Sequence, residues 1–119
     1  MKTDNIIVDK SKAFAVRTIN LYKYLCNEKK EFVLSKQLLR SGTSIGANVK
    51  EAIRGQSKDD FAHKINISLK EASESEYWLE LLCETNYITK PQFDSIIADC
   101  RELIKILTSI IKTCRKGVQ

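Results

Sequence analysis

Three carboxylates have the spacing that could support chemistry. Glu76, Glu80 and Glu84 recur every four residues, so on a helix they share one face. A bundle that binds two metal ions through carboxylates also uses a Glu-x-x-His pattern, and the sequence contains none. We therefore expect these glutamates to form a solvated acidic face and not a metal site.

The cysteine and histidine residues do not suggest a site either. His63 is the single histidine, which leaves it without partners for a metal site, and we expect a partly buried polar residue or a surface contact. The four cysteines lie far apart and form no Cys-x-x-Cys pair. We expect reduced thiols that pack as small hydrophobic groups. They are Cys26, Cys83, Cys100 and Cys114.

Motifs that hold a phosphate in a loop or pair two histidines are also missing. The sequence has no glycine-rich phosphate loop and no His-x-x-x-His, and its one Gly-x-Ser-x-Gly, at 42–46, lies inside a segment with helical periodicity. We predict that the protein is not an enzyme and that it has no catalytic, cofactor-binding or metal-binding residue.

Positive charge is the strongest chemical signal. The formal net charge is +5 and the isoelectric point is about 9.0. Residues 57–88 hold three lysines and seven acidic residues, a balance of −4, which leaves +9 for the remainder. A surface that follows phosphates and a merely solvated set of cations both fit this pattern, as does pairing between acidic and basic faces of neighbouring subunits. The candidate nucleic-acid-binding residues are Lys50, Arg54, Lys58, Arg101, Lys105, Lys112 and Lys116.

The composition indicates that helices position these residues. Apolar residues make up 43% of the chain, which has only four glycines and one proline. In the last third, apolar residues recur in steps of four and three, which predicts a helix over 90–116 that begins with a Thr89–Gln92 capping box. A second apolar line makes this face wide enough to contact another subunit as well as its own bundle. It consists of Ile96, Leu103 and Ile110.

Three more helices are expected, over 9–27, 34–54 and 58–87. Ser57 and Asp60 predict the start of the third, and Gly42 and Gly46 in the second predict a close approach by another element. Residues before Asp9 are expected to form an irregular arm. Short connections favour antiparallel neighbours, so we predict one domain over 1–119, an all-α, up-down-up-down antiparallel four-helix bundle.

No apolar run approaches the roughly 20 residues that cross a bilayer, and no signal peptide is evident. We expect a cytoplasmic protein.

Polar residues interrupt two of the apolar stripes. Glu76 does so in the third helix, and Ser41 and Asn48 do so in the second. A carboxylate in that position needs a partner, and we predict an inter-helix salt bridge to Arg40 or Arg17. Polar contacts that set the helix register are the favoured interpretation, and a ligand pocket is the alternative.

The second helix also carries a longer motif. The segment from Leu38 to Ala52, LLRSGTSIGANVKEA, resembles the RS-x-x-SI-x-x-N-x-x-E signature of the 23S rRNA-intervening sequence protein family. The segments FAHK at 61–64 and LKEASESEYWL at 69–79 are similar to that family's third helix. Where many members have glycine directly after the glutamate, this chain continues with Ala52, Ile53 and Arg54, so the helix is expected to end later.

The resemblance implies a four-helix bundle that assembles into a ring-like homopentamer. Related accessory proteins of retroelements form basic pentameric barrels that bind nucleic acid and a reverse transcriptase. The motif positions, together with Glu76, suit helix packing or subunit contacts better than catalysis. They are Arg40, Ser41, Ser44, Asn48 and Glu51.

We therefore predict a non-enzymatic homo-oligomeric scaffold that binds RNA or DNA through its basic residues, without cofactor or membrane. The alternative is an adaptor that docks a partner protein without nucleic acid.

Overall fold

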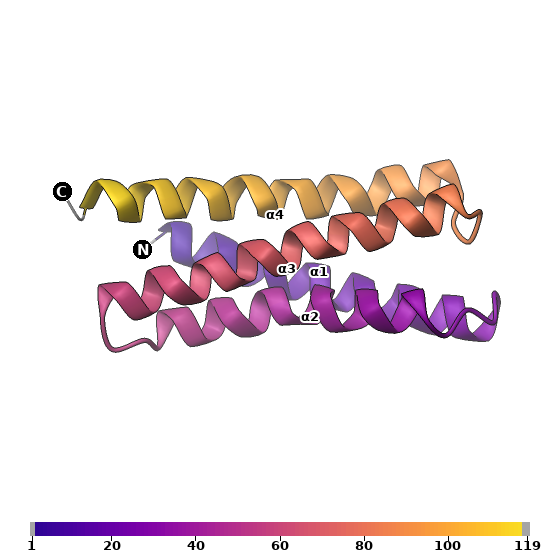
Figure 1. Cartoon of the computed structure of the whole chain (residues 1–119), viewed down its shortest axis with the longest axis horizontal. Coiled ribbons are helices and arrows are strands. Elements are labelled where there is room, and N and C mark those ends of the chain that lie inside the picture. Colours follow the sequence, from indigo (N-terminus) through magenta and orange to yellow (C-terminus); the bar gives the residue numbers. More distant parts are fainter. Residues whose placement is uncertain (1, 118–119) are drawn as a thin grey trace.

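Four helices form the protein, as predicted. The computed structural model describes the backbone of residues 2–117 and the side chains of residues 6–116, and Met1, Val118 and Gln119 lie outside it. The helices are α1 (Lys2–Asn27), α2 (Leu34–Ile53), α3 (Lys58–Glu84) and α4 (Lys90–Gly117). They lie alongside one another in an elongated bundle of 49 × 21 × 21 Å (Figure 1).

Side-chain contacts between the helices give their directions. In the α1–α2, α2–α3 and α1–α4 pairs, the residue number rises along one helix while it falls along the other, so the helices of each pair are antiparallel. Since α3 then runs in the same direction as α1, α3 and α4 are antiparallel as well. The chain thus runs alternately up and down (Figure 1). Between α1 and α2, Ser11 lies beside Gly46 and Thr18 beside Gly42. Between α2 and α3, Ser41 contacts Ser75 and Glu51 contacts Lys64. Between α1 and α4, Lys10 contacts Glu102 and Arg17 contacts Asp99.

The predicted helix starts of α3 and α4 are confirmed. The Ser57 hydroxyl accepts a hydrogen bond from the Asp60 amide at 3.0 Å. Before α4, the Thr89 amide donates to the Gln92 side chain at 2.8 Å, and the Gln92 amide donates to the Thr89 hydroxyl at 3.3 Å. This is a reciprocal capping box, which satisfies two amides that the helix leaves unpaired.

Two predicted helix ends were wrong. The chain has no irregular arm over residues 2–8, because α1 begins at Lys2 and Ile7 is buried with 1% exposure. The third helix ends at Glu84 and not at residue 87, because Thr85 caps it and Asn86 adopts a left-handed φ of 69°. Both differences depend on tertiary packing or turn geometry, which an apolar stripe does not specify.

One hydrophobic core runs the length of the bundle and draws on all four helices. The second apolar line of α4 belongs to it, since Ile96, Leu103 and Ile110 are 4%, 1% and 8% exposed. The wide apolar face of α4 is therefore already covered within one chain.

The four helix–helix seams are unequal. Each helix packs closely on the next one in the chain, whereas α1 and α4 meet less extensively. An open groove of about 530 Å³ lies between them, lined in part by Leu21, Tyr24, Ile88 and Ile96. Within the described part of the chain, no helix combines the length and apolarity that crossing a membrane requires.

Candidate nucleic-acid interface

All seven predicted cationic residues are exposed, and five of them lie near one end of the bundle. Lys50 and Arg54 lie at the end of α2, and Lys58 begins α3. We call these three residues the turn patch. Three lysines lie on the outer face of α4, and we call them the α4 patch. Lys105 is near the middle of this helix, and Lys112 and Lys116 lie toward its carboxyl end. The α2–α3 turn and the end of α4 lie at the same end of the molecule (Figure 1, left).

None of the six cations in the two patches forms an ion pair with an acidic side chain in residues 6–116. Arg101 differs, because its Nε lies 2.9 Å from Glu76 Oε2 and its second terminal nitrogen lies 4.0 Å from Glu80. Its charge is therefore compensated in the seam between α3 and α4.

The part of the turn patch on α2 and the α4 patch face different directions. In the described part of the chain, α2 packs against α1 and α3 but does not contact α4. The outer faces of diagonally opposed helices point away from each other. Lys50 and Arg54 therefore face away from the α4 patch, whereas Lys58 lies on α3, which packs against α4.

A hollow of about 560 Å³ lies beside the turn patch, and we call it the α2–α3 hollow. Three cationic and two acidic side chains line it, and one ion pair, between Lys64 Nζ and Glu51 Oε1 at 3.2 Å, crosses between the helices. The lining residues are Ala47, Lys50, Glu51, Arg54, Gly55, Gln56, Asp60 and Lys64.

Small polar side chains hold α2 against α3. The Ser41 and Ser75 hydroxyls, both buried, share a hydrogen bond of 2.8 Å, and the Ser68 hydroxyl donates to the Ile45 carbonyl at 2.7 Å. No buried side-chain nitrogen or oxygen among residues 6–116 lacks a hydrogen-bond partner. Serine fits here because it occupies little space and still satisfies its hydroxyl inside the core.

Other positions of the motif lie along the same edge of α2. Ser44 donates to the Arg40 carbonyl at 2.6 Å, and Asn48 donates to the Ser44 carbonyl at 2.8 Å. Across the seam, burial raises the pKa of Glu71, as does the charge of Glu74, while Arg40 and Ser44 act to lower it. These contacts agree with packing roles for the motif.

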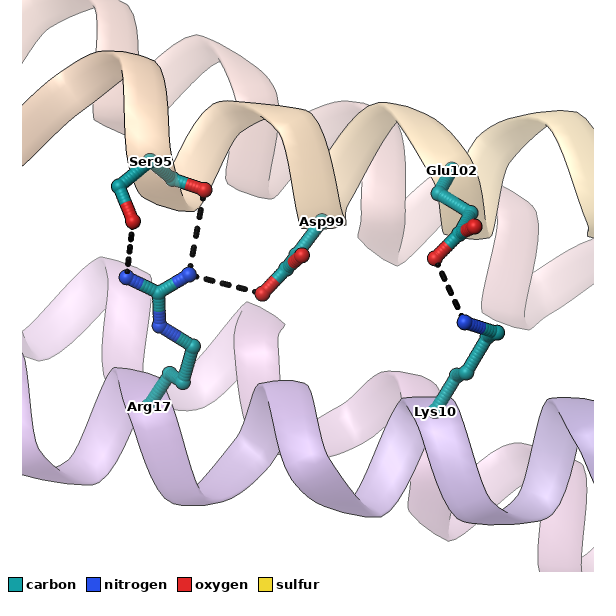
Figure 2. A network of polar contacts seen from close by, with 5 residues as sticks. All are labelled: Lys10, Arg17, Ser95, Asp99 and Glu102. Atoms are coloured by element: carbon teal, nitrogen blue, oxygen red, sulfur yellow. Dashed lines mark hydrogen bonds and ion pairs between the residues drawn. The ribbon is translucent and has the colours of Figure 1, made fainter.

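The predicted salt bridge from Glu76 to Arg40 or Arg17 was wrong. Glu76 pairs with Arg101, and its side chain keeps 30% exposure, because it lies at the edge of α3 that faces α4. Arg17 instead reaches from α1 to α4, where it donates to Asp99 at 2.8 Å and to the Ser95 hydroxyl and carbonyl at 2.9 and 3.1 Å (Figure 2). An apolar stripe places a residue on a face, but it does not tell which neighbouring helix lies there.

Glu31 is a structurally important residue that the sequence reading missed. Its carboxylate is only 7% exposed and accepts hydrogen bonds from the amides of Val33, Leu34 and Ser35 at 3.1, 3.0 and 2.6 Å. Burial acts to raise its pKa, but these amide donors outweigh burial and hold the pKa below its usual value. An acidic residue just before the predicted start at residue 34 was the available signal.

The thiol groups differ in burial. Cys100 is fully buried, donates to the Ala72 carbonyl at 3.3 Å, and has its pKa raised to about 12, chiefly by burial. Cys26, Cys83 and Cys114 are only partly buried. His63 is exposed. In the described residues, no three or more histidine, cysteine and acidic side chains are grouped so that they could hold a metal ion.

Comparison with known proteins places this bundle in a family. The model of the 23S rRNA-intervening sequence protein family matches residues 3–109. A crystal structure from Bacteroides thetaiotaomicron VPI-5482, described as a protein with unknown function from the S23 ribosomal protein family, is 63% identical. The match covers 92% of this chain and 98% of that one, with a TM-score of 0.91. A search of curated proteins gives no match. Since the family model spans most of the bundle, the chain belongs to the 23S rRNA-intervening sequence protein family.

Proposed function

We propose that this protein is a non-enzymatic homo-oligomer, a pentamer, that binds RNA or DNA through its basic end. The observation that carries the proposal is the group of six exposed cations without ion-pair partners among the described side chains. A cation that neutralises a phosphate releases a counterion, which favours association at low salt. A cation without an ion-pair partner can bind a phosphate directly, because no carboxylate of the protein has to be displaced from it first.

A cyclic assembly would strengthen the effect. Rotation about one axis leaves every subunit at the same height, so bundles that stand along this axis place the basic ends of all copies on one side of a ring. Lys50 and Arg54 face away from the α4 patch within one chain, and neighbouring copies can bring patches of both kinds side by side. The pentameric number comes from the resemblance to the family and not from the fold of one chain.

The bundle supports a binding role better than a catalytic one. Its most buried thiol, Cys100, stays protonated at neutral pH, because burial raises its pKa to about 12. Catalysis through a nucleophile needs an activated group beside a base in a pocket. His63 and Cys114 both line a shallow hollow of about 240 Å³, but no hydrogen bond joins these two described side chains.

The test is the mass in solution, measured by light scattering after size exclusion, with and without a generic RNA at low salt. A mass near five times 13.6 kDa that rises with RNA is the expected result. Affinity should then fall steeply between low and physiological salt. A monomer that is indifferent to RNA would contradict both the ring and the binding role.

A second candidate, an adaptor for a partner protein, is favoured by one observation. Phe32 and Val33, on the turn between α1 and α2, are 57% and 71% exposed. Together they offer a small apolar surface that a protein partner could cover. A partner that is recovered in stoichiometric amount after nuclease treatment, and that is lost from the Phe32→Ala/Val33→Ala variant, would favour the adaptor.

A further inference from the structure

The α2–α3 hollow has the chemistry of an anion site. Two helix ends and the turn between them form its walls, and it contains the amino groups of Lys50 and Lys64 and the guanidinium of Arg54. Lysine supplies a compact charge and arginine a planar pair of donors, and both are common phosphate ligands.

Two of these cations are available. Lys50 and Arg54 are exposed and form no ion pair with an acid in residues 6–116. Lys64 is held differently, because its amino group lies 3.2 Å from Glu51 Oε1. Asp60 also lines the hollow, so two carboxylates oppose three cations there.

The Glu51–Lys64 pair can be exchanged for a ligand. The Glu51 side chain is 60% exposed, so its carboxylate can turn into water, whereas Lys64 is 35% exposed and remains in the hollow. Exposed ion pairs of this kind contribute little to stability, so opening one has a small cost.

We infer that the α2–α3 hollow binds a phosphate group through Lys50, Arg54 and Lys64, and that Glu51 competes with the phosphate for Lys64. This inference rests on the proposed nucleic-acid binding, where the phosphate is a backbone phosphodiester. A free phosphate ion is the other source of the same chemistry. Glu51, a position of the motif, then lowers affinity while it links α2 to α3.

The first experiment compares two double variants that remove the same charge. Lys50→Ala/Arg54→Ala alters the hollow, and Lys105→Ala/Lys112→Ala alters the outer face of α4. Anisotropy of a labelled RNA hairpin gives the affinity across a salt series. We expect the hollow variant to lose at least about tenfold in affinity and to reduce the salt slope by about one, because one phosphate is no longer neutralised, with a much smaller change in the α4 variant. Equal losses in both variants would show diffuse attraction and overturn the inference, while nucleic-acid binding would stand.

The second experiment tests the competition directly. Glu51→Gln removes the opposing charge, so we expect affinity for the same hairpin to rise about threefold or more, and Lys64→Met should lower it. Unchanged or weaker binding by Glu51→Gln would contradict the role of Glu51. Thermal melting of each variant checks that it remains folded.

Titration with inorganic phosphate distinguishes a free phosphate ion from a backbone phosphodiester as the ligand of the hollow. We expect titration with phosphate to shift the backbone amide resonances of Gly55 and Lys64 in the wild type but not in Lys50→Ala/Arg54→Ala. If the hairpin does not bind and phosphate still produces these shifts, the proposed function fails while the hollow remains an anion site. If neither binds, the inference fails as well.

Discussion

At the scale of single residues, Glu31 has the most unusual environment. It is the only charged residue that is buried among the described side chains. A buried carboxylate is tolerated when several donors satisfy it, and three amides at the start of α2 do so here. Because those amides have no partner within the helix, the carboxylate serves as the cap that α2 otherwise lacks.

Replacing this cap should weaken folding in a pH-dependent way. We expect Glu31→Gln to lower the free energy of unfolding by about 1–2 kcal/mol at neutral pH. The folded-state pKa is lowered, so the stabilisation is complete above the unfolded value of about 4.3 and is lost as the pH falls through the folded one. Urea unfolding of the wild type and of Glu31→Gln at pH 7 and pH 3 measures the difference in their free energy of unfolding. We expect this difference to be smaller at pH 3.

The control is Glu28→Gln, which removes an exposed carboxylate from the same turn. It should leave stability nearly unchanged at both pH values. A gap between wild type and Glu31→Gln that is as large at pH 3 as at pH 7 would mean that the charge of Glu31 is not what stabilises α2.

Side-chain partners were harder to predict than side-chain faces. The apolar stripe predicts the face on which Glu76 lies but not its partner, which is Arg101, whereas Arg17 pairs with Asp99. The order of helices around the bundle decides such pairs, and single-helix periodicity contains no information about it. Glu31 was missed for a related reason, since its burial depends on how the turn folds back over α2.

At the scale of helices, glycine sets the distance between α1 and α2. A Cβ atom on Gly42 would lie 2.5 Å from Thr18 Cγ2, closer than two carbon atoms can approach. A Cβ on Gly46 would find its nearest neighbour, Ser11 Oγ, at 3.3 Å. The two glycines were predicted to mark a close approach, and the structure confirms it, with Gly42 the tighter of the two.

Gly42→Ala should therefore destabilise the protein although alanine favours a helix by about 1 kcal/mol. Overpacking a fitted contact costs about 1–3 kcal/mol, and we expect a net loss measurable by urea unfolding. The same substitution at Gly46 is the matched control and should have a smaller effect.

A double-mutant cycle identifies the clashing atom. Thr18→Ala removes Cγ2 and Oγ1, so Gly42→Ala should cost less in that background than in the wild type. An equal cost in both backgrounds would mean that Thr18 is not the residue that resists the added methyl group.

Helix existence and caps were predictable, whereas helix ends were less so. Periodicity and capping residues are local, and they predicted all four helices and the starts of α3 and α4 correctly. The extension of α1 to Lys2 depends on Ile7 reaching the shared core, which is a tertiary effect. The positive φ of Asn86, which follows the end of α3, likewise belongs to the turn and not to the helix pattern.

At the scale of the whole molecule, the α1–α4 seam differs from the others. Two ion pairs cross it, and their side chains are a little under half exposed (Figure 2). Arg17 and Asp99 are 39% and 49% exposed, and Lys10 and Glu102 are 45% and 49% exposed. Such pairs are each worth about 1 kcal/mol or less. Arg17 makes the larger contribution, because it bonds to Ser95 as well as Asp99.

Loss of these bonds should loosen α1 selectively. We expect Arg17→Met, which keeps the apolar stem, to lower stability by about 1 kcal/mol and to speed amide hydrogen exchange in α1 more than in α2 or α3. Lys90→Met removes an exposed pair within α4 and should change neither quantity appreciably. Uniform loss of protection across the bundle would show that Arg17 does not act on this seam in particular.

The unequal seams also bear on how quickly the chain reaches this structure. The three extensive seams join helices that follow each other directly, so most of the core forms by closing short loops. Only the α1–α4 contacts join distant parts of the chain, with separations of 78 to 92 residues. Folding rates fall as contacts become more distant in sequence, because the entropy of closing a long loop must be overcome first. Rapid folding is therefore expected, with α1 and α4 meeting last, after consecutive hairpins of helices have already formed.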